Sequence, residues 1–274
     1  MIAEIGGRRF EWGSRTYVMG IVNVTPDSFS GDGLGADADA AVGQGVRMVR
    51  EGADMLDVGG ESTRPGHVPI TVAEEIERTE AVVRRLVAQA GVPISIDTYK
   101  EEVAQSAVAA GATILNDVWG LTRSPALAEL AAARGRALVL MHNQDGTDYA
   151  GDLMEEIKRF LAAAASRAVA AGVPPEKVIV DPGIGFGKTA EHNWEVMRRF
   201  AELKELGHPV LVGTSRKSFI GKLLDLPVTD RLEGTAATVA AAVLRGADIV
   251  RVHDVLQMTR VVRVADHMSR PRHS

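Results

Sequence analysis

The sequence predicts a single α/β domain of the (β/α)8, or TIM-barrel, class. Three observations lead to this prediction: the number of strand-like runs, their apolar character and the length of the chain. Eight short runs rich in Val, Ile and Leu alternate with eight longer amphipathic stretches. Strands that are apolar on both faces are typical of a parallel sheet covered by helices. The 274 residues suit a barrel of eight such units.

The two kinds of segment follow one another regularly along the chain. We expect strands at Val18–Val22, Asp54–Val58, Val92–Ile96, Thr113–Val118, Ala137–Met141, Val178–Val180, Val210–Val212 and Asp248–Val252. The stretches between them carry apolar residues at helical spacing. We expect helices at Asp37–Glu51, Val72–Ala90, Lys100–Ala110, Pro125–Arg134, Asp152–Ala171, His192–Leu206, Thr229–Leu244 and Val255–Met268.

Closure of the sheet does not follow from periodicity alone, so an open doubly wound sheet is the alternative. No linker or change of composition divides the chain, and we therefore treat residues 1–274 as one domain. Ahead of the first unit, Ile2–Ile5 and Arg8–Glu11 flank Gly6-Gly7, which is a two-residue hairpin signal. We expect this β-hairpin to cover the N-terminal, or bottom, end of the barrel.

Composition and charge exclude several classes of protein. The chain has 31 Lys and Arg against 36 Asp and Glu, a net charge of −5, so we expect no nucleic-acid partner. The absence of cysteine excludes disulfides, thiolate metal sites and a cysteine nucleophile. Apolar runs such as Ala236–Leu244 are too short to cross a bilayer. The N-terminal residues lack a basic region followed by an apolar stretch, so we expect no targeting segment. We expect a cytoplasmic protein without a membrane partner.

Polar side chains follow seven of the eight predicted strands. They are Asn23, Asp97, Asn116-Asp117, His142, Asp181, Ser215-Arg216-Lys217, and the pair Arg251 and His253. Because catalytic groups of a barrel lie at the C-terminal ends of its strands, these residues predict one shared pocket. A single Asp or Asn there is about as often a turn residue or a helix N-cap. Lys217, Arg251 and His253 are not N-cap residues, and they favour the pocket.

Arg251 and His253 stand two residues apart on a strand, so their side chains point to the same side. A guanidinium beside an imidazole is a suitable anion site, and a solvated pair is the alternative. The Gly-rich segment Asn23–Asp39 adds oxygen donors suited to a phosphate and a hard cation, although an ordinary surface loop is commoner.

Two further segments contribute to the same face. Gly59–Thr71 carries hydroxyls and a cation in Ser62–Gly66. Asp181–Lys188 places a carboxylate at a strand end, followed by three glycines that permit close approach of the backbone to a ligand. Its spacing matches neither a P-loop nor a dinucleotide fingerprint. His142, His192 and His208 lack zinc-ligand spacing, and we interpret them as structural or surface residues.

The donors and acceptors of the pocket indicate its ligand. Two carboxylates (Asp97 and Asp181), an amide (Asn116) and an ammonium (Lys217) suit a flat heterocycle with a guanidine-like edge and a carbonyl. The corner formed by Asn23, Arg251 and His253 suits an attached phosphate or pyrophosphate. The residues alone therefore predict a barrel enzyme for a phosphorylated heterocycle, without specifying the reaction.

Seven motifs, in order, resemble the dihydropteroate synthase family, from about Tyr17 to the end of the last helix. The motifs are Gly20–Ser30, Gly59–Gly66, Ser95–Thr98, Asn116–Val118, Asp181–Lys188, Gly213–Ser218 and Arg251–Asp254. The resemblance implies a (β/α)8 barrel. It also implies a transferase that joins p-aminobenzoate to 6-hydroxymethyl-7,8-dihydropterin pyrophosphate, releasing pyrophosphate and forming 7,8-dihydropteroate for folate synthesis.

The resemblance also implies roles for individual residues. The pterin would be bound by Asp97, Asn116, Met141, Asp181, Phe186, Gly213 and Lys217. Pyrophosphate would be bound by Asn23, Thr63, Arg251 and His253, with Asn23 also on Mg²⁺. The p-aminobenzoate site, where sulfonamides bind in this family, would be formed by Phe29, Thr63, Arg64, Pro65 and Ser218. The expected catalytic residues are Asp97, Lys217, Arg251 and His253.

The expected reaction is a dissociative one, in which Mg²⁺, Arg251 and His253 offset charge on the leaving pyrophosphate and Asp97 stabilises the pterin cation. The resemblance further implies a homodimer formed through the last helices, where apolar residues exceed the needs of one face: Val255, Leu256, Met258, Val261, Val262 and Val264. Two alternatives are a pterin-binding barrel of the methyltransferase type and a non-catalytic homologue that binds pterin.

Overall fold

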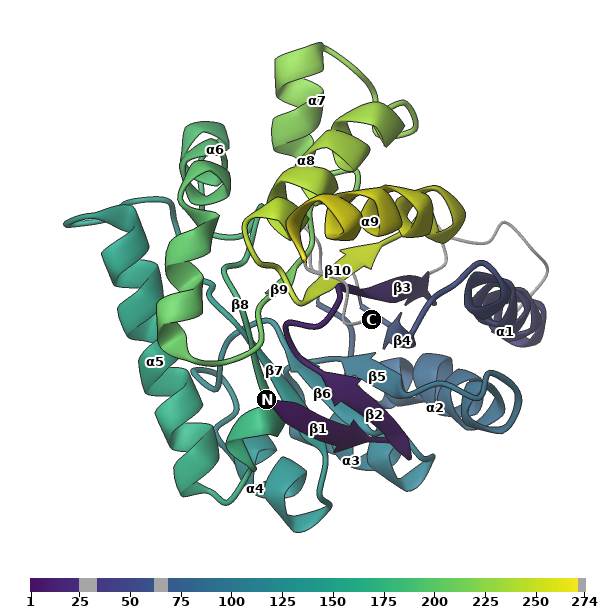
Figure 1. Cartoon of the computed structure of the whole chain (residues 1–274). Coiled ribbons are helices and arrows are strands. Elements are labelled where there is room, and N and C mark those ends of the chain that lie inside the picture. The colour runs from purple at the N-terminus through teal and green to yellow at the C-terminus, as the bar shows by residue number, and fades with distance from the viewer. Residues whose placement is uncertain (25–33, 62–68, 271–274) are drawn as a thin grey trace.

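A barrel of eight parallel strands forms the centre of the computed structural model, which describes residues 1–24, 34–61 and 69–270 (Figure 1). The strands are β3 (Tyr17–Asn23), β4 (Met55–Gly59), β5 (Ile94–Asp97), β6 (Ile114–Asp117), β7 (Ala137–Met141), β8 (Val178–Asp181), β9 (Leu211–Val212) and β10 (Ile249–Val252). They pair in the order β8-β7-β6-β5-β4-β3-β10-β9. The predicted fold class is confirmed.

The two end strands of this order meet each other. Val180 and Val210 form a parallel bridge, and the backbone N–H of Val180 donates to the carbonyl oxygen of Pro209 at 2.9 Å. This contact brings β8 beside the residue that precedes β9, so the sheet curls into a nearly closed barrel. The alternative of an open doubly wound sheet is excluded.

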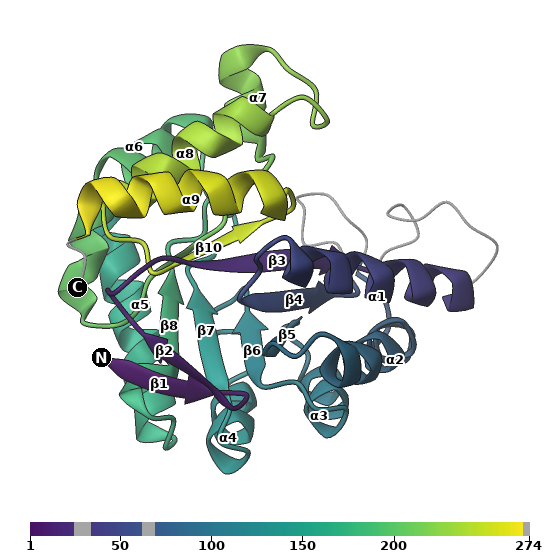
Figure 2. The same cartoon turned by 45° about the vertical axis from the view of Figure 1, so that its right-hand side comes forward.

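Helices cover the outside of the barrel, as the view in Figure 2 shows. They are α1 (Leu34–Arg50), α2 (Val72–Gln89), α3 (Glu101–Ala109), α4 (Ala126–Ala133), α5 (Leu153–Ala170), α6 (Ala190–Arg198), α7 (Ser218–Leu224), α8 (Leu232–Leu244) and α9 (Val255–Ser269), with short 3-10 segments η2 (Pro175–Lys177) and η3 (Phe200–Leu206). The predicted helix at 192–206 is in fact two segments, α6 and η3. The short helix α7 was not predicted.

Local contacts determine where α6 begins, where it gives way to η3 and where η3 ends. Thr189 caps α6 because its side chain accepts from the backbone N–H of His192. At the other end, the guanidinium of Arg199 binds Glu195 and Glu202, and the tighter 3-10 turns that follow end at Gly207, whose φ of 70° is left-handed. A left-handed glycine of this kind ends the helical turns, and the chain then continues to β9.

The N-terminal hairpin, β1 (Ile2–Ile5) and β2 (Arg8–Glu11), closes the bottom of the barrel, as predicted. Phe10, Trp12 and Tyr17 form an aromatic group with ring centroids 4.9–5.4 Å apart. They share one buried cluster with the first inward residues of the strands, including Met55 and Ile249. Burial of this apolar surface stabilises the lower half of the barrel.

Inward-facing side chains change from apolar to polar along several of the strands. In β4, Met55 is followed two residues later by Asp57, and in β10 Ile249 is followed by Arg251. Residues two apart face the same side of a strand, so the apolar members lie below the polar ones. The fold thereby collects buried polar groups at the C-terminal mouth.

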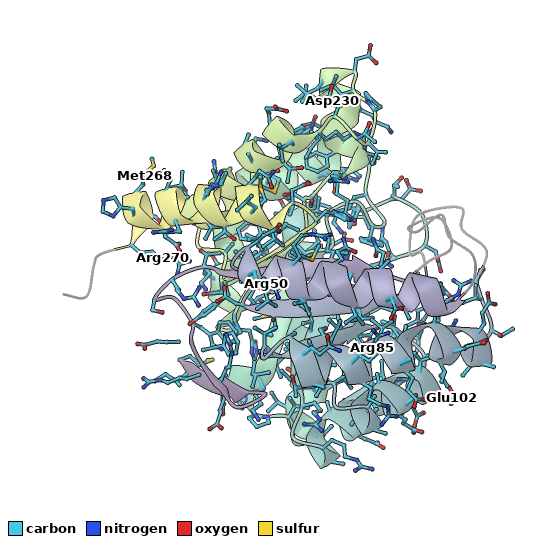
Figure 3. All side chains as sticks on the ribbon, turned by 90° about the vertical axis from the view of Figure 1, so that its right-hand side faces the viewer. Arg50, Arg85, Glu102, Asp230, Met268 and Arg270 are labelled. Carbon is cyan, nitrogen blue, oxygen red and sulfur yellow. The ribbon has the colours of Figure 1, made fainter. Side chains whose placement is uncertain are left out.

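The outer faces of the helices carry charged side chains, among them Arg85 and Glu102 in Figure 3. Arg85 on α2 pairs with Asp39 on α1 at 2.7 Å, and both side chains are exposed. An exposed pair of this kind contributes little to stability. In the described part of the chain, no helix is long and apolar enough to cross a membrane.

Candidate active site

Strand register brings four of the predicted site residues to the mouth of the barrel as two neighbouring pairs. Asp97 at the end of β5 lies opposite Asn116 of β6 in the parallel ladder. Met141 at the end of β7 lies opposite Asp181 at the end of β8. All four are buried. The barrel therefore sets two carboxylates, an amide and an apolar thioether around one opening.

A network of buried charges joins the strands across this opening. Arg251 donates from Nε to Oδ2 of Asp57 at 2.6 Å and from Nη2 to Oδ2 of Asp97 at 2.7 Å. The amide nitrogen of Asn116 donates to the same Oδ2 of Asp57 at 3.0 Å. Three strands, β4, β5 and β10, are thus cross-linked by one guanidinium, and the side chain of Asn116 is oriented by Asp57.

Burial and neighbouring charges shift the pKa values of the groups in this network. It raises the pKa of Asp97 to about 7, although the neighbouring Arg251 opposes the shift. For Arg251, burial is outweighed by Asp57 and Asp97, and its pKa is raised, so it stays a cation. Oδ1 of Asp97 has no hydrogen-bond partner among the described residues. A ligand atom that donates a hydrogen bond or carries positive charge would satisfy this oxygen.

The second carboxylate, Asp181, is held by the turn that follows β8. Its Oδ1 accepts from the backbone N–H of Gly183 at 2.7 Å. Gly183 has a φ of 70°, and a Cβ there would collide with the carbonyl oxygen of His142, so only glycine permits this approach. Burial raises the pKa of Asp181 to about 6, against the effect of Gly183 and of Lys217.

Lys217 reaches the same region from the loop after β9. Its Nζ lies 4.0 Å from the centre of the Phe186 ring, a cation–π contact between two predicted pterin-site residues. The loop is fixed by Arg216, which has a φ of 58° and donates to the carboxylate of Asp254 through Nε at 3.0 Å. The strained backbone at Arg216 therefore serves to aim its neighbour inward.

The predicted anion corner lies on the opposite side, near α1. Asn23 and His253 line a cavity of about 450 Å³ together with Gln44 and Arg47. Ser215 Oγ lies 3.0 Å from Nδ1 of His253 and accepts from its backbone N–H at 3.2 Å. Burial, followed by nearby Arg251, lowers the pKa of His253 to about 3, so its imidazole is neutral. It would bind an anion as a hydrogen-bond donor rather than as a cation.

The remaining predicted residues divide into two groups. Gly213 follows β9, with Arg251 next to it, and Ser218 is the first residue of α7 directly after Lys217. The residues Phe29, Thr63, Arg64 and Pro65 lie outside the described residues. The described structure therefore includes all of the predicted pterin-binding residues and every predicted pyrophosphate-binding residue except Thr63. Of the predicted p-aminobenzoate-binding residues, it includes only Ser218.

Comparison with known proteins agrees with this geometry. Residues 19–253 match the family model described as "Pterin binding enzyme". A dihydropteroate synthase of Clostridium beijerinckii is 48% identical, over 96% of this chain and 98% of that protein. The crystal structure of a Clostridium difficile dihydropteroate synthase in the presence of pteroic acid is 48% identical, has a TM-score of 0.93, and is matched over 96% of this chain and 100% of that one.

A third similar protein is the Xanthomonas albilineans dihydropteroate synthase in complex with 7,8-dihydropteroate. Its TM-score is 0.90 at 39% identity, with 99% of this chain and 100% of that chain covered. The chain belongs to the dihydropteroate synthase family. It is therefore an enzyme of a transferase family, and the family resemblance predicted from the seven motifs is confirmed.

One residue that the sequence analysis missed lies at the centre of this dihydropteroate synthase-type site. Asp57 is fully buried and contacts both Asn116 and Arg251. It lies inside the apolar run of β4 rather than at its end, and it was missed because only the residues at strand ends were considered. An acidic residue at an inward position of an otherwise apolar strand was the available signal.

Two lysines were also missed, the half-buried Lys100 and the buried Lys188. Lys100 donates to Glu61 at 2.6 Å, to Glu75 at 2.7 Å and to the carbonyl oxygen of Ile70 at 2.7 Å. It thus ties together the described ends of the predicted Gly59–Thr71 loop. Lys188 lies behind Asp181, where its Nζ is 2.9 Å from Nδ1 of His142. Neither follows a strand directly, and their partners depend on the tertiary fold.

Proposed function

We propose that this protein condenses 6-hydroxymethyl-7,8-dihydropterin pyrophosphate with p-aminobenzoate to give 7,8-dihydropteroate and pyrophosphate. The observation that carries the proposal is the grouping of Asp97, Asn116, Asp181 and Lys217 at one mouth of a barrel whose relatives are dihydropteroate synthases. Two similar structures were determined in the presence of pteroic acid and in complex with 7,8-dihydropteroate, which supports the same substrate class.

The donors and acceptors suit a pterin ring. Asp181 accepts the paired N–H groups of the guanidine-like edge, since a carboxylate forms strong charge-assisted bonds to such a pair. Asn116 and Asp97 meet the other ring nitrogens, and Lys217 donates to the carbonyl side. Met141, Phe186 and Gly213 form the apolar walls. In this arrangement, the hydrogen-bonding edges of the pterin ring meet polar groups that are already buried in the protein.

The reaction proceeds by loss of pyrophosphate before the amine attacks. Breaking the C–O bond leaves a cation on the methylene that the dihydropterin ring delocalises, and the carboxylate of Asp97 stabilises it. The neutral amine of p-aminobenzoate then forms the new C–N bond and releases a proton. No covalent enzyme intermediate is needed. The network of Arg251 with Asp57 and Asp97 holds this carboxylate in place during the reaction.

Pyrophosphate is held at the corner formed by Asn23, Arg251 and His253, with Thr63 added from the family resemblance. Asn23 provides an amide oxygen beside this corner, and no hydrogen bond within the described part of the chain engages its side chain. One oxygen ligand suits Mg²⁺, which commonly keeps several waters and takes its remaining ligands from phosphate. When bound, the ion would supply positive charge against the leaving pyrophosphate.

The p-aminobenzoate site is proposed from the family resemblance, with Phe29, Thr63, Arg64, Pro65 and Ser218 as its residues. Ser218 is well placed for this role, because it follows Lys217 and begins α7 at the rim of the mouth. The expected cytoplasmic location of the protein stays a prediction.

The test is release of pyrophosphate from the dihydropterin pyrophosphate with magnesium, with and without p-aminobenzoate, while dihydropteroate is followed in parallel. One pyrophosphate per dihydropteroate supports the proposal. Pterin binding without turnover would favour the non-catalytic homologue instead. Transfer of a methyl group from a methylated folate would favour the methyltransferase type.

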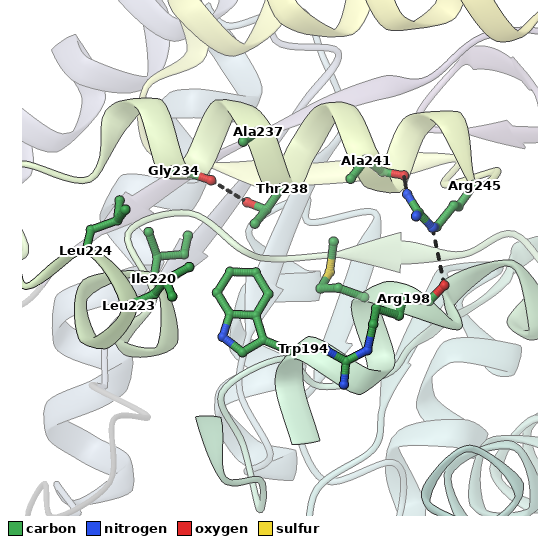
Figure 4. Close-up of a pocket in the computed structure, with 11 residues that line it drawn as sticks. Trp194, Arg198, Ile220, Leu223, Leu224, Gly234, Ala237, Thr238, Ala241 and Arg245 are labelled. Atoms are coloured by element: carbon green, nitrogen blue, oxygen red, sulfur yellow. Dashed lines mark hydrogen bonds between the residues drawn. The ribbon is translucent and has the colours of Figure 1, made fainter. Parts of the chain in front are cut away.

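We also propose that two copies of the chain associate. A pocket of about 320 Å³ lies between α6, α7 and α8, where Ile220, Leu223 and Leu224 of α7 line the pocket together with Trp194 of α6 (Figure 4). Leu223 and Leu224 are exposed, and so are Val264 and Met268 on α9. Of the six residues expected at a dimer interface, Val255, Met258 and Val262 pack inside the protein's own core. The exposed apolar residues of α7 to α9 therefore form the better candidate surface.

Sedimentation at micromolar concentration tests the dimer. We expect a species of twice the 29.2 kDa chain mass, and we expect Leu223→Glu to shift it toward the monomer because it places a charge in an apolar contact. Glu102→Lys, a charge change on the exposed outer face of α3, is the control. A wild-type species of one chain mass would overturn this proposal.

A further inference from the structure

A buried lysine behind the proposed pterin site has no part in the chemistry described above. Lys188 is 9% exposed. Its Nζ lies 2.9 Å from Nδ1 of His142 and donates to the carbonyl oxygens of Gly183 at 3.1 Å and Phe186 at 3.0 Å. An ammonium has three hydrogens, and three acceptors here surround it. The lysine therefore joins the turn after β8 to the end of β7.

The two carbonyl groups belong to residues that shape the two sides of the slot. Gly183 donates its N–H to the carboxylate of Asp181. Phe186 carries the ring that lies under the ammonium of Lys217. A single buried side chain thus holds the residue that orients Asp181 and the residue that contacts Lys217. Loss of these bonds would free the turn at both points.

The third partner, His142, is itself fixed. Its ring stacks with Tyr149 at 6.0 Å and meets Phe160 edge-on at 4.9 Å. Burial, followed by the charge of Lys188, lowers the pKa of His142 to about 3, so the imidazole is neutral and Nδ1 accepts a hydrogen bond. His142 was predicted to be a structural or surface residue, and these contacts make it the anchor for Lys188.

We propose that Lys188 is a positioning residue for the pterin site, which holds the turn after β8 and supplies a buried positive charge that favours the ionised form of Asp181. This proposal rests on the proposed function, in which Asp181 binds the pterin edge. The chemistry requires an ionised carboxylate, because a protonated one would offer an O–H where the pterin N–H groups need an acceptor.

The charges around Asp181 give the direction of the effect. Burial raises its pKa to about 6, and the N–H of Gly183 and the cations Lys217, Arg251 and Lys188 oppose that rise. Burial lowers the pKa of Lys188 to about 7, while Asp181 raises it and Lys217 lowers it. Below about pH 7 the lysine is charged, and removing it shifts the pKa of Asp181 upward. Pterin binding should then weaken at a higher pH than in the wild type.

The test measures the dissociation constant of 6-hydroxymethyl-7,8-dihydropterin by calorimetry from about pH 5 to about pH 7.5. We expect Lys188→Met to move the midpoint of the pH dependence up by about one unit and to weaken binding about tenfold near pH 6. Lys188→Gln keeps N–H donors without the charge, so it should show the same shift with a smaller loss near pH 7.5. Lys204→Met, which removes an ammonium bound to buried Asp248 at the bottom of the barrel, should leave the midpoint unchanged.

The outcomes separate this proposal from the proposed function. A midpoint in Lys188→Gln equal to that of the wild type overturns the proposed effect of the Lys188 charge on Asp181, and this variant decides the question if Lys188→Met does not fold. Wild-type protein that does not bind the dihydropterin, or an Asp181→Ala variant that binds it as tightly as the wild type, overturns the proposed function itself.

Discussion

The two ends of the barrel are built from the same strands, yet they bury opposite kinds of side chain. At the bottom, Phe10 and Met55 belong to a cluster of apolar residues closed by the hairpin. At the top, the buried carboxylates of Asp57 and Asp97 accept short hydrogen bonds from the half-buried guanidinium of Arg251. Apolar burial stabilises the fold, whereas buried charges add little net stability even when paired. The bottom of the barrel therefore contributes most to stability, and the top holds the residues that are proposed to bind the substrates and take part in the reaction.

The largest effect is expected at the bottom, on stability alone. Phe10→Ala removes a fully buried ring that contacts Trp12 and Tyr17, and we expect the free energy of unfolding to fall by about 3–5 kcal/mol. Urea unfolding measures the loss, and the turnover of the folded fraction should stay near that of the wild type. Ile2→Ala on the exposed side of the same hairpin should cost less than about 1 kcal/mol. A large drop in turnover for Phe10→Ala would contradict the division between the two ends.

At the top of the barrel, we expect substitutions to affect turnover more than stability. Asp97→Asn keeps the shape of the side chain but removes the charge that is proposed to stabilise the pterin cation. We expect turnover to fall on the order of 10²–10³-fold, with a smaller change in unfolding free energy. Steady-state kinetics and urea unfolding of the same preparation check this. Turnover unaffected by the substitution would remove Asp97 from the proposed mechanism.

Asp57 and Asp248 allow the two ends to be compared with one residue type. Each is fully buried, but Asp57 binds Arg251 at the top, while Asp248 binds Lys204 and the backbone N–H of Val210 at the bottom. We expect Asp57→Asn to lower kcat/KM about 10–100-fold through misplacement of Arg251 and Asn116. Asp248→Asn is the matched control, and it should lower stability with little effect on kcat/KM. Equal losses of kcat/KM in the two variants would show that a buried aspartate affects catalysis equally from either end of the barrel.

The same contrast explains what could be predicted from the sequence. Alternating apolar runs and helical stretches determine the barrel, because that pattern is repeated locally in each unit. Polar residues directly after strands were equally visible, and the structure places Asp97, Asn116 and Asp181 at one mouth. The seven-residue helix α7 was missed, since a stretch that short, with Gly221 in its middle, carries almost no periodic signal.

What could not be predicted is which charges pair. Arg251 was expected at an anion corner, but the sequence did not show that its guanidinium also binds Asp57 and Asp97. These residues lie far apart in the chain, so their contact depends on how eight strands are placed around the barrel. Lys188 likewise finds His142 only through the packing of β7 against β8. Local motifs identify the residue types of a site, and the tertiary fold assigns their partners.

The smallest effect is expected from the carboxylate that follows Asn116 in the chain. Asp117 is buried, yet it accepts from the backbone N–H groups of Trp119 at 2.8 Å and Leu121 at 2.6 Å instead of binding Arg251. Because its neighbour faces the inside of the barrel, Asp117 faces the other way. We expect Asp117→Asn to change turnover less than about twofold and to cost about 1–2 kcal/mol of stability through weaker bonds to the turn.

The pH dependence of that cost sharpens the prediction. Burial raises the pKa of Asp117 to about 6, against the effect of the two N–H groups. A raised pKa means that the folded protein prefers the protonated form, so this contribution to stability is complete below about pH 4 and is lost as the pH rises through about 6. Asparagine does not titrate, and the destabilisation should therefore be larger at about pH 5 than at about pH 7.5, by about 1 kcal/mol. Urea unfolding of both proteins at the two pH values measures the difference, and the opposite order would mean that the turn stabilises the ionised carboxylate, as the mouth is proposed to do for Asp181.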